Sequence, residues 1–369
     1  MHDISLKLAY SEVEKIGIDA KKTVGKADLQ NIKMFNLFGW FCTFVGYTSG
    51  ALFLNPISVY LVSLGNYIHW MKAHYVLHGA YDNIPSVPTQ FNSKNFAKGI
   101  RRYIDWLDWI VPEHWRHEHN SLHHYNTSQR EDPDNIERLF KDIRRANIPV
   151  IFKYFITFAI ALTWKLSYYA PSTYLYYLKK KGKVSITFHN FYILFNPFCK
   201  LGLGFWYNCI LPYGLFRSVL IPILFLPFGT NYVVNSFLVS IFAEALANLH
   251  SFLMIGPNHT ASDLHKFIQP SKGKFGHFIH QVYCTANYSS KNTLHDYWHG
   301  YMNFHLEHHI WPDLTMLQYS RASKKLRKIC MANSLPYIED NVFKRAKYML
   351  NVCVGKSSTK IYSSQGQVE

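Results

Sequence analysis

Three short histidine-rich stretches are the part of this chain whose residue types could do chemistry. On a helix, histidines four residues apart project from the same face, while adjacent histidines differ in direction by about 100°. Neutral imidazole is the commonest protein ligand for iron, zinc and copper. The stretches spell HxxxH, HxxxHH and HxxHH, and they contribute eight candidate metal ligands: His74 and His78; His119, His123 and His124; His305, His308 and His309.

The number of imidazoles points to more than one metal ion. A structural zinc takes about four ligands and a catalytic zinc about three and a water, so eight are too many for one zinc. In the doublets His123-His124 and His308-His309, each neighbour can address a different ion, and no cysteine lies nearby. About eight or nine nitrogen donors fit two six-coordinate ions such as iron, and this donor set differs from the Glu-rich di-iron helix bundles. The spacing therefore predicts a dinuclear metal site.

A ninth ligand would complete two well-filled coordination shells. His250 lies at the end of an apolar run and His259 lies just beyond it. Both qualify by position, so the residues alone leave this choice open.

Other polar residues near the stretches are candidates for supporting roles. The second nitrogen of a ligating imidazole is usually held by a carboxylate or a carbonyl. Glu118, Asp134 and Glu307 could do this, or they could be solvated surface charges. Three further histidines fall out of register with the stretches, and we expect them to support the site or to lie on the surface: His69, His114 and His117.

Membrane-spanning helices must bring the stretches to one place. Residues 34–71 hold no formally charged side chain and are interrupted at Asn55-Pro56. A helical span needs roughly 20 residues, so this run predicts two crossings, at 34–54 and 56–71, joined by a tight turn. A second hairpin with an uncharged turn is predicted at 205–228 and 232–252. Lys33 and Lys72 flank the outer ends of the first hairpin, which predicts that those ends face the cytosol.

The apolar stretch 149–170 needs a separate interpretation because it contains Lys153 and Lys165. The histidine stretches must face the same side to share a site, so an even number of crossings separates the second stretch from the third. The hairpin at 205–252 already supplies that even number. We therefore expect 149–170 to be an amphipathic helix at the membrane interface. Within the hairpin, Arg217 is expected either to pair with Glu244 or to snorkel to the interface.

The composition agrees with one membrane-embedded unit rather than several soluble domains. Aromatic residues make up 17% of the 369 residues, and the charged residues are concentrated between long uncharged runs. The net charge of +16 lies beside apolar spans, which suits an anionic membrane surface better than nucleic acid. The six cysteines are scattered without disulfide spacing, and no secretory signal peptide is found. We expect the N-terminus to stay in the cytosol.

The predicted fold is an all-α integral membrane protein. It has four transmembrane helices in two hairpins, an interfacial helix, and a cytosolic helical cap that holds the metal site. The expected parts are a cytosolic N-terminal segment (1–33), a membrane domain (34–325), and a basic C-terminal helix with a disordered tail (326–369). Both termini and the metal site are expected on the cytosolic side.

At these residues the chain resembles the membrane fatty acid desaturases. The resemblance rests on the three stretches, on Asn126 and Asp132-Pro133-Asp134 after the second, and on Asn303 to Pro312 around the third. It extends through Gln281-Val282 and Asn287 and covers roughly residues 34–325. His305 stands where front-end desaturases typically carry glutamine, which disfavours that subgroup. Asn258-His259 looks like the family's additional histidine, so the resemblance favours His259 as the ninth ligand, with His250 in reserve.

The resemblance implies a non-haem di-iron enzyme. It would use O2 and two electrons to introduce a double bond into a fatty acyl chain linked to a lipid or to coenzyme A. The chain has no His-Pro-Gly-Gly motif of a fused cytochrome b5 domain, so the electrons are expected from a separate ferredoxin or cytochrome b5. A lipid hydroxylase on the same scaffold is the nearest alternative. A histidine-rich membrane zinc hydrolase or transporter is an alternative of another class, and it predicts a single zinc.

Overall fold

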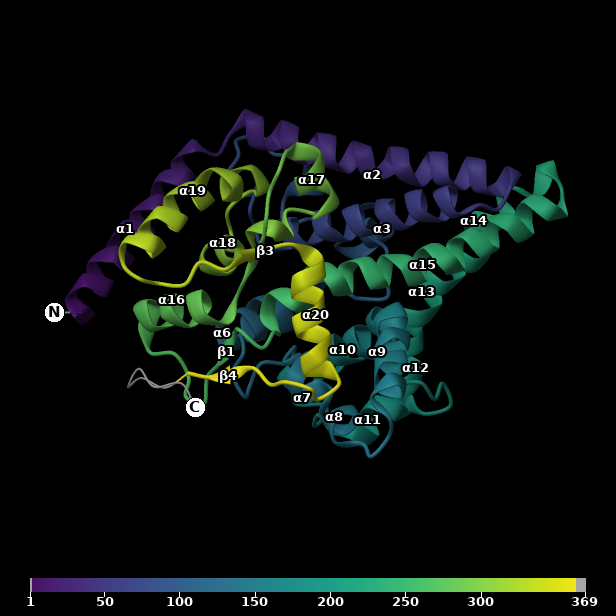
Figure 1. The fold of residues 1–369 in the computed structure, drawn as a ribbon. Coiled ribbons are helices and arrows are strands. Elements are labelled where there is room, and N and C mark those ends of the chain that lie inside the picture. The colour runs from purple at the N-terminus through teal and green to yellow at the C-terminus, as the bar shows by residue number, and fades with distance from the viewer. Residues whose placement is uncertain (1, 363–369) are drawn as a thin grey trace.

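Helices make up almost all of the ordered structure. The computed structural model describes residues 2–362, without the side chains of residues 2–4 and 188. In Figure 1, α2 (Lys26–Leu52) and α15 (Thr230–His259) extend to the right of the molecule, and α1 (His2–Thr23) and α19 (Met316–Ala332) lie at the left. The strands in this range have two residues each: β1 (His265–Lys266) pairs in parallel with β4 (Lys360–Ile361), and β2 (Asn287–Tyr288) with β3 (Glu339–Asp340). The prediction of a helical fold is therefore confirmed. Strand β4 falls in the stretch predicted to be disordered, whereas residues 363–369 of that stretch lie outside the described residues.

The first hairpin consists of α2 (Lys26–Leu52) and α3 (Pro56–Leu77). Its turn follows from the sequence, because Asn55 accepts a hydrogen bond from the Ser58 backbone at 2.9 Å and Pro56 opens the next helix. Glycines let the two helices approach closely: a Cβ at Gly65 would lie 2.8 Å from the Gly39 carbonyl oxygen. Helix α3 continues past the predicted end of the span at residue 71, and this extension carries His74.

The second hairpin consists of a broken helix over 200–228 and the long α15 (Thr230–His259), joined at Gly229, whose φ is +119°. The tips of the two hairpins lie side by side at the right of Figure 1. Tyr47 and Ser240 share a hydrogen bond of 2.8 Å, and the Asn235 amide donates to the Ala51 carbonyl at 3.1 Å. Both hairpins therefore point in the same direction, away from the rest of the chain.

Several long helices are interrupted by π-helical turns that precede prolines. The broken helix reads α12 (Lys200–Phe205), the π-turn η5 (Trp206–Ile210), α13 (Leu211–Leu215), the π-turn η6 (Phe216–Leu220), α14 (Ile221–Ile223) and the 3₁₀ turn η7 (Leu226–Phe228). Pro212 and Pro222 each lie two residues after a π-turn. Proline has no N–H to donate and its ring crowds the carbonyl of the preceding turn, so the helix widens there.

The stretch predicted as an interfacial helix is part of a longer helix. Helix α9 (Val150–Trp164), the π-turn η4 (Lys165–Tyr169) and α10 (Ala170–Lys180) form one continuous run of 31 residues. Three helices of the described chain are long and apolar enough to cross a membrane: this run, the broken helix over 200–228, and α15. The predicted spans at 205–228 and 232–252 fall within two of these. Helices α2 and α3 are not among them, since glycine, serine, threonine and asparagine dilute their apolar residues.

The charges inside these helices are paired differently from the expectation. Lys165 lies 3.3 Å from a carboxylate oxygen of Asp108 and 3.3 Å from one of Glu244. Glu244 is therefore the partner of Lys165 rather than of Arg217. The Arg217 guanidinium lies over the rings of Tyr47 and Tyr213, each 5.7 Å away. Of the two alternatives considered for Arg217, the ion pair with Glu244 is not formed, because the buried Lys165 lies there, and Arg217 does not reach the surface, because it is buried as well.

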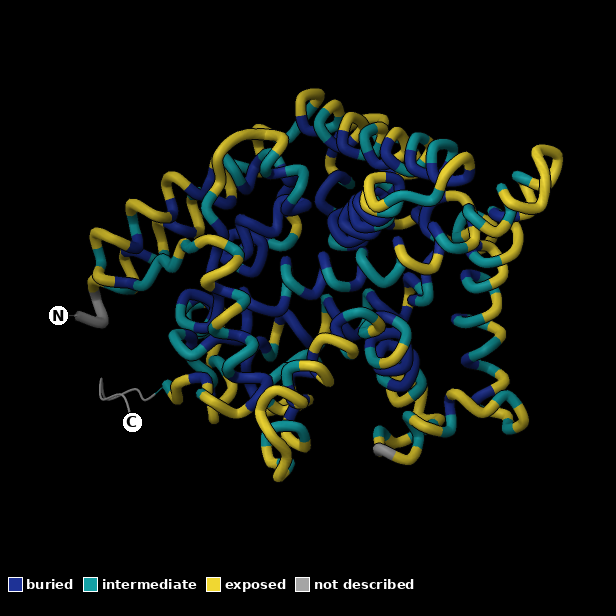
Figure 2. The backbone as a smooth tube through the Cα atoms, turned by 45° about the vertical axis from the view of Figure 1, so that its right-hand side comes forward, coloured by how far each residue is buried: buried dark blue, intermediate teal, exposed yellow. Residues whose placement is uncertain are grey.

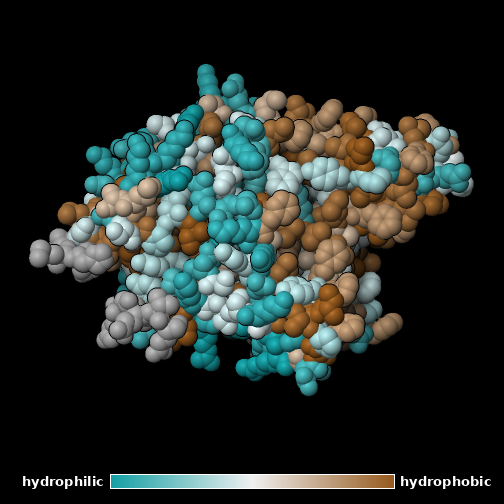
Figure 3. All heavy atoms as spheres, in the orientation of Figure 1, coloured by the Kyte–Doolittle hydropathy of each residue, from teal (hydrophilic) through white to brown (hydrophobic). Residues whose placement is uncertain are grey.

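Exposed apolar side chains cover the hairpin half of the molecule. The right side of Figure 3 is dominated by hydrophobic residues, and the left side by hydrophilic ones. The exposed residues on α2, the broken helix and α15 include Leu37, Phe41, Phe44, Leu203, Leu220, Leu224, Val234, Phe237 and Phe242. A contiguous apolar surface of this extent is typical of contact with lipid. Most residues of α3, by contrast, are buried. Figure 2 shows that the buried backbone gathers at the centre of the molecule.

The opposite half is a polar assembly of shorter helices. It contains α1 (His2–Thr23), α16 (Gly273–Cys284), α17 (Thr293–Trp298), the 3₁₀ turn η8 (Met302–Phe304), α18 (His305–Ile310), α19 (Met316–Ala332) and α20 (Val342–Cys353). Helix α1 packs on α19, and a Cβ at Gly17 would lie 2.7 Å from Cδ1 of Trp311. The connection from α3 to α9 also folds into short pieces: η1 (Thr89–Phe91), η2 (Gly99–Arg101), α4 (Arg102–Asp105), α5 (Pro112–Trp115), the π-helix η3 (Arg116–His123), α6 (His124–Asn126), α7 (Ile136–Leu139) and α8 (Lys141–Arg145). Helix α11 (Phe188–Ile193) precedes α12.

Candidate metal centre

Four segments far apart in the sequence deliver the predicted histidines to one buried cluster. The end of α3 carries His74 and His78, and η3 with the start of α6 carries the second stretch. His259 is the last residue of α15, and α18 carries the third stretch. The structure brings together all nine favoured candidates: His74, His78, His119, His123, His124, His259, His305, His308 and His309.

The ring nitrogens fall into overlapping groups within the cluster. Nitrogens of His74, His78, His119 and His308 all lie within 4.8 Å of one another. The same limit holds for His123, His259 and His309, and for His124, His308 and His309. His305 joins through its Nε2, which is 2.6 Å from Nε2 of His259. The cluster thus has two lobes, linked by His124 and His308.

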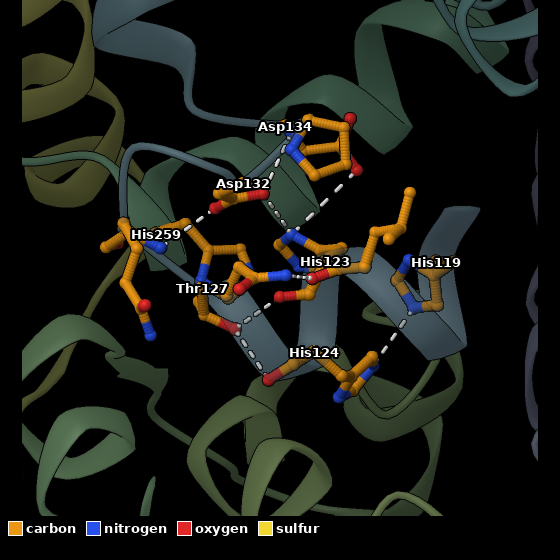
Figure 4. Close-up of polar contacts among 12 residues, drawn as sticks. His119, His123, His124, Thr127, Asp132, Asp134 and His259 are labelled. Carbon is orange, nitrogen blue, oxygen red and sulfur yellow. Dashed lines mark hydrogen bonds and ion pairs between the residues drawn. The ribbon is translucent and has the colours of Figure 1, made fainter. Parts of the chain in front are cut away.

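The geometry of the second stretch differs from the α-helical expectation. Residues 116–123 form a π-helix, in which hydrogen bonds close from residue i to i+5, and the His124 N–H donates to the His119 carbonyl. Consequently Nε2 of His124, not of His123, approaches Nε2 of His119, at 3.1 Å (Figure 4). The wider turn brings His124 beside His119 and between the lobes, while His123 lies with His259 and His309.

The spacing of the ring nitrogens fits a pair of metal ions. Nε2 of His74 lies 2.8 Å from Nε2 of His308. The Nε2 atoms are equally close in two other pairs, at 2.6 Å for His259 and His305 and at 3.1 Å for His119 and His124. Two nitrogens about 2.1 Å from one ion and at right angles to each other are about 3 Å apart. Facing lone pairs at such distances repel each other unless a cation or a proton lies between them. Within the described chain, Nε2 of His78 and of His309 are buried without a hydrogen-bond partner.

Protein acceptors fix which nitrogen of several rings faces the centre of the cluster. Nδ1 of His123 donates to Asp132 at 2.9 Å, so its Nε2 carries the lone pair (Figure 4). The Tyr319 hydroxyl donates to the carbonyls after the third stretch and therefore accepts from Nδ1 of His308, 3.1 Å away. In the same way, the Thr127 hydroxyl donates to the His123 carbonyl and accepts from Nδ1 of His309 at 3.3 Å.

These acceptors are not the carboxylates expected from the sequence. Asp132, Tyr319 and Thr127 hold the rings, whereas Glu307 accepts hydrogen bonds from Asn287 at 2.9 Å and Tyr337 at 2.7 Å. Burial raises the pKa of Glu307 to about 7. The DPD sequence after the second stretch was a usable signal for Asp132, but Thr127 and Tyr319 lie in no pattern that marks them.

Two further carboxylates lie beside the cluster, the buried Glu118 and the partly exposed Asp134. Burial and the neighbouring Asp134 raise the pKa of Glu118 well above its usual range, and burial raises the pKa of Asp134 to about 6. One Asp134 oxygen is 3.9 Å from Nδ1 of His123, which is longer than a hydrogen bond. Glu118 and Asp134 therefore lie next to the site without holding an imidazole.

The remaining candidates lie outside the cluster. The His250 ring stacks on Tyr67 with a centroid distance of 4.2 Å and faces Trp298 at 5.0 Å. His69 packs against Trp40 at 4.4 Å, and His114 stacks on Tyr177 at 4.3 Å. His117 is partly exposed. None of these four belongs to a group of ring nitrogens close enough to share an ion among the described residues.

The clustered rings are suited to bind a cation because they are neutral. Burial lowers the pKa values of His119, His124, His308 and His309 well below the usual value near 6.5. A neutral imidazole offers the lone pair that a metal needs. His123 is the exception: burial opposes its charged form, but Asp132 outweighs burial and raises the pKa of His123.

An apolar cavity of about 780 Å³ adjoins the cluster. Aromatic and aliphatic side chains from α9, η4, α11 and α15 form most of its wall, among them Trp164, Tyr168, Phe191, Phe252 and Ile255, and His119, His123, His259, His305, His308 and His309 form one side. The exposed residues Arg138, Leu139 and Lys141 also line it, so it reaches the surface beside α7 and α8. The volume falls within the range of about 300–1,000 Å³ that is typical of small-molecule sites. Such a cavity accommodates a flexible apolar molecule next to the histidine nitrogens.

Comparisons with known proteins agree with the motifs. A family model described as fatty acid desaturase matches residues 49–341. A Delta(8)-fatty-acid desaturase of Euglena gracilis is 26% identical over 124 residues, which are 34% of this chain and 29% of that protein. The match thus spans less than a third of the relative's length. No solved structure matches the chain.

Proposed function

Because this chain belongs to the fatty acid desaturase family, we propose that it is an O2-dependent desaturase that introduces a C=C bond into a fatty acyl chain. The observation that carries the proposal is the meeting of the histidine nitrogens with the wall of an apolar cavity of about 780 Å³. An acyl chain is the kind of flexible apolar ligand that such a cavity accommodates. The acyl group would enter while linked to a lipid or to coenzyme A.

Two iron ions are the cofactors that the donor set fits best. His74, His78, His119 and His308 would hold one ion, and His123, His259, His305 and His309 the other, with His124 between the lobes. His250 stays in reserve. When bound, the iron pair would supply the O2-derived oxidant that removes hydrogen from an unactivated methylene group.

The chain's own residues would position the substrate and exclude water. Trp164, Tyr168 and Phe252 present apolar faces along the cavity, so a methylene chain gains contact while water is kept from the histidines. Exposed Lys141, where the cavity reaches the surface, provides a cation for the phosphate of a lipid head group or of coenzyme A.

The electrons would come from a separate protein. The acyl chain gives up two hydrogen atoms, which carry two electrons and two protons. The carrier supplies two more electrons, and the solvent supplies two more protons. Together the four electrons and four protons reduce one O2 to two water molecules. A ferredoxin or a cytochrome b5 would serve as the carrier.

The arrangement of the hairpins supports a four-helix membrane topology. Both hairpin tips lie together, while the other end of each hairpin leads to the histidine cluster. The helix over 150–180 would lie along the membrane face rather than cross it. The hydroxyl of Tyr169 in this helix lies 3.4 Å from Nδ1 of His119. Near the start of the helix, Lys153 donates a hydrogen bond to the Arg144 carbonyl at 2.8 Å. With basic residues beside the cluster, the positive-inside rule supports a cytosolic location for the cluster and for both termini.

Product analysis after expression in a host with a compatible electron donor tests the proposal. Gas chromatography of the lipids should reveal a new unsaturated fatty acid, which disappears in His123→Ala and His308→Ala variants. His250→Phe, which preserves the stacking on Tyr67, is the matched control and should retain the product. A hydroxy fatty acid in place of the olefin would overturn desaturation in favour of hydroxylation.

A further inference from the structure

The outer face of α19 carries a stripe of cations that nothing on the helix balances. Arg321, Lys324, Lys325 and Lys328 are exposed and fall at spacings of three and four residues, so they lie on one face. The helix contains no aspartate or glutamate. A neighbouring residue, Arg327, is paired with Glu339 at 3.3 Å, whereas the four stripe residues form no ion pair within the described part of the chain. Like charges at this spacing destabilise a helix, so the helix's own stability does not explain the stripe.

The inner face of the same helix touches the histidine cluster. Tyr319 is buried, and its hydroxyl lies 3.1 Å from Nδ1 of His308. One helix, with a diameter of about 10 Å, therefore separates the positive surface from a ring of the cluster. Tyr169 also contacts the cluster, at His119, but the lysines along its helix, Lys179 to Lys181, begin ten residues later, about 15 Å along the axis.

The location of α19 indicates what could cover this surface. Figure 1 shows α19 with α1 at the left of the molecule, whereas the hairpin tips lie at the far right. In Figure 3, which has the same orientation, the left side of the molecule is mainly hydrophilic and the exposed apolar surface lies on the right. A membrane that contacts this apolar surface therefore does not meet the stripe. A protein with a negatively charged face complements it in charge.

We propose that the exposed face of α19 is the docking surface for an acidic protein that carries one electron at a time. The proposal rests on the desaturase function proposed above, which requires two electrons from outside for each double bond. Two successive docking events supply them, one electron each, and the oxidised carrier leaves after each event. Docking on α19 shortens the distance to His308 to the thickness of this helix.

Direct binding in lipid nanodiscs tests the docking surface without reference to catalysis. The probe is the soluble haem domain of a cytochrome b5, with an acidic ferredoxin as a second probe, and the discs contain only zwitterionic phosphatidylcholine. The test variant combines Arg321→Glu, Lys324→Glu and Lys328→Glu. The matched control combines Lys179→Glu, Lys180→Glu and Lys181→Glu, which changes the net charge by the same amount at another exposed site.

We expect the test variant to raise the Kd of at least one probe by roughly tenfold or more and to flatten its dependence on salt. The control variant should bind within about twofold of the unmodified protein. Unchanged binding in the test variant would overturn the proposal, as would a larger loss in the control. The comparison is then repeated in discs that contain anionic lipid. An effect of the substitutions that occurs only there would also overturn the proposal, because the stripe would then be a membrane contact. Should charge reversal prevent folding, the glutamine versions of the same substitutions serve the same comparison.

A chemical reductant separates this proposal from the desaturase function. With dithionite in place of the carrier protein, the test variant should form the double bond as fast as the unmodified protein. If dithionite supports the double bond and carrier binding is unaffected, the docking surface is wrong and the function stands. If binding weakens but no donor yields a double bond in any form of the protein, the docking surface stands and the function is wrong.

Discussion

At the scale of single residues, the site depends on side chains that hold the second nitrogen of each ring. Asp132, Tyr319 and Thr127 accept from Nδ1 of His123, His308 and His309, and thereby direct each Nε2 to the cluster. Such partners fix the tautomer and orientation of a ligating ring, and they raise its basicity. Metal affinity is therefore expected to depend on residues that never touch the metal.

Asp132→Asn should weaken metal binding by roughly 10–100-fold while the protein remains folded. Asparagine keeps the size of the side chain but removes the charge that the Nδ1–H of His123 meets at 2.9 Å. The measurement is metal retained after dialysis against graded concentrations of a chelator. Asp19→Asn, an exposed change on α1, is the control. Equal retention in both variants would show that Asp132 does not support the ligand.

The choice of ninth ligand is tested by a matched pair of substitutions. His259→Phe should lose iron and activity, because a ring nitrogen of His259 lies within 4.8 Å of nitrogens of His123 and His309. His250→Phe should retain both, because that ring stacks on Tyr67 outside the cluster. Elemental analysis of the two purified variants gives the answer. Iron loss in the His250 variant alone would reverse the assignment.

At the scale of elements, helix geometry explains which parts of the site could be predicted. Spacing of four residues correctly indicated that His74 and His78 share a face, because α3 is a regular helix to its end. For the second stretch the same reasoning was incomplete: the rings of His119 and His123 do stack, with centroids 5.2 Å apart, but the π-helix η3 also brings Nε2 of His124 to 3.1 Å from Nε2 of His119. Histidine spacing does not distinguish the two helix types. Asp132 was also missed as a partner: the DPD sequence marked the right loop, but Asp134 was chosen from it, because spacing in a loop does not tell which carboxylate faces the ring.

The packing of α2 on α3 depends on a glycine pair. A Cβ at Gly65 would lie 2.8 Å from the Gly39 carbonyl oxygen and 3.1 Å from the Thr43 nitrogen, both of which are backbone atoms. Gly65→Val should therefore push the helices apart, destabilise the protein by about 1–3 kcal/mol and displace His74 and His78. Thermal unfolding in detergent measures the change. Gly25→Ala, where a Cβ meets nothing within 4 Å, should leave the melting temperature nearly unchanged.

At the scale of the whole molecule, the tips of the two hairpins lie far from the histidine cluster, at the opposite ends of α3 and α15. Both predicted hairpins occur, and their tips meet through Tyr47 and Ser240. The helix over 150–180 was harder to predict, because the burial of Lys165 between Asp108 and Glu244 is a tertiary pairing that local sequence does not reveal. The prediction, which was guided by the charges of Lys153 and Lys165, therefore ended this helix at residue 170, whereas it continues to Lys180.

Labelling from the two sides of sealed membrane vesicles tests this polarity. Cysteines introduced by Thr230→Cys at a hairpin tip and Lys325→Cys on α19 should react with an impermeant maleimide from opposite sides, in a Cys199→Ser background. The reason is that a hairpin of membrane length separates the two positions. Labelling of both from the same side would contradict the four-helix topology.

Metal analysis of the purified protein tests the central claim most directly. The nine clustered histidines predict about two iron ions per chain, and iron content should fall sharply in His123→Ala and His308→Ala. A single zinc per chain, or iron content that is indifferent to these substitutions, would contradict the di-iron account.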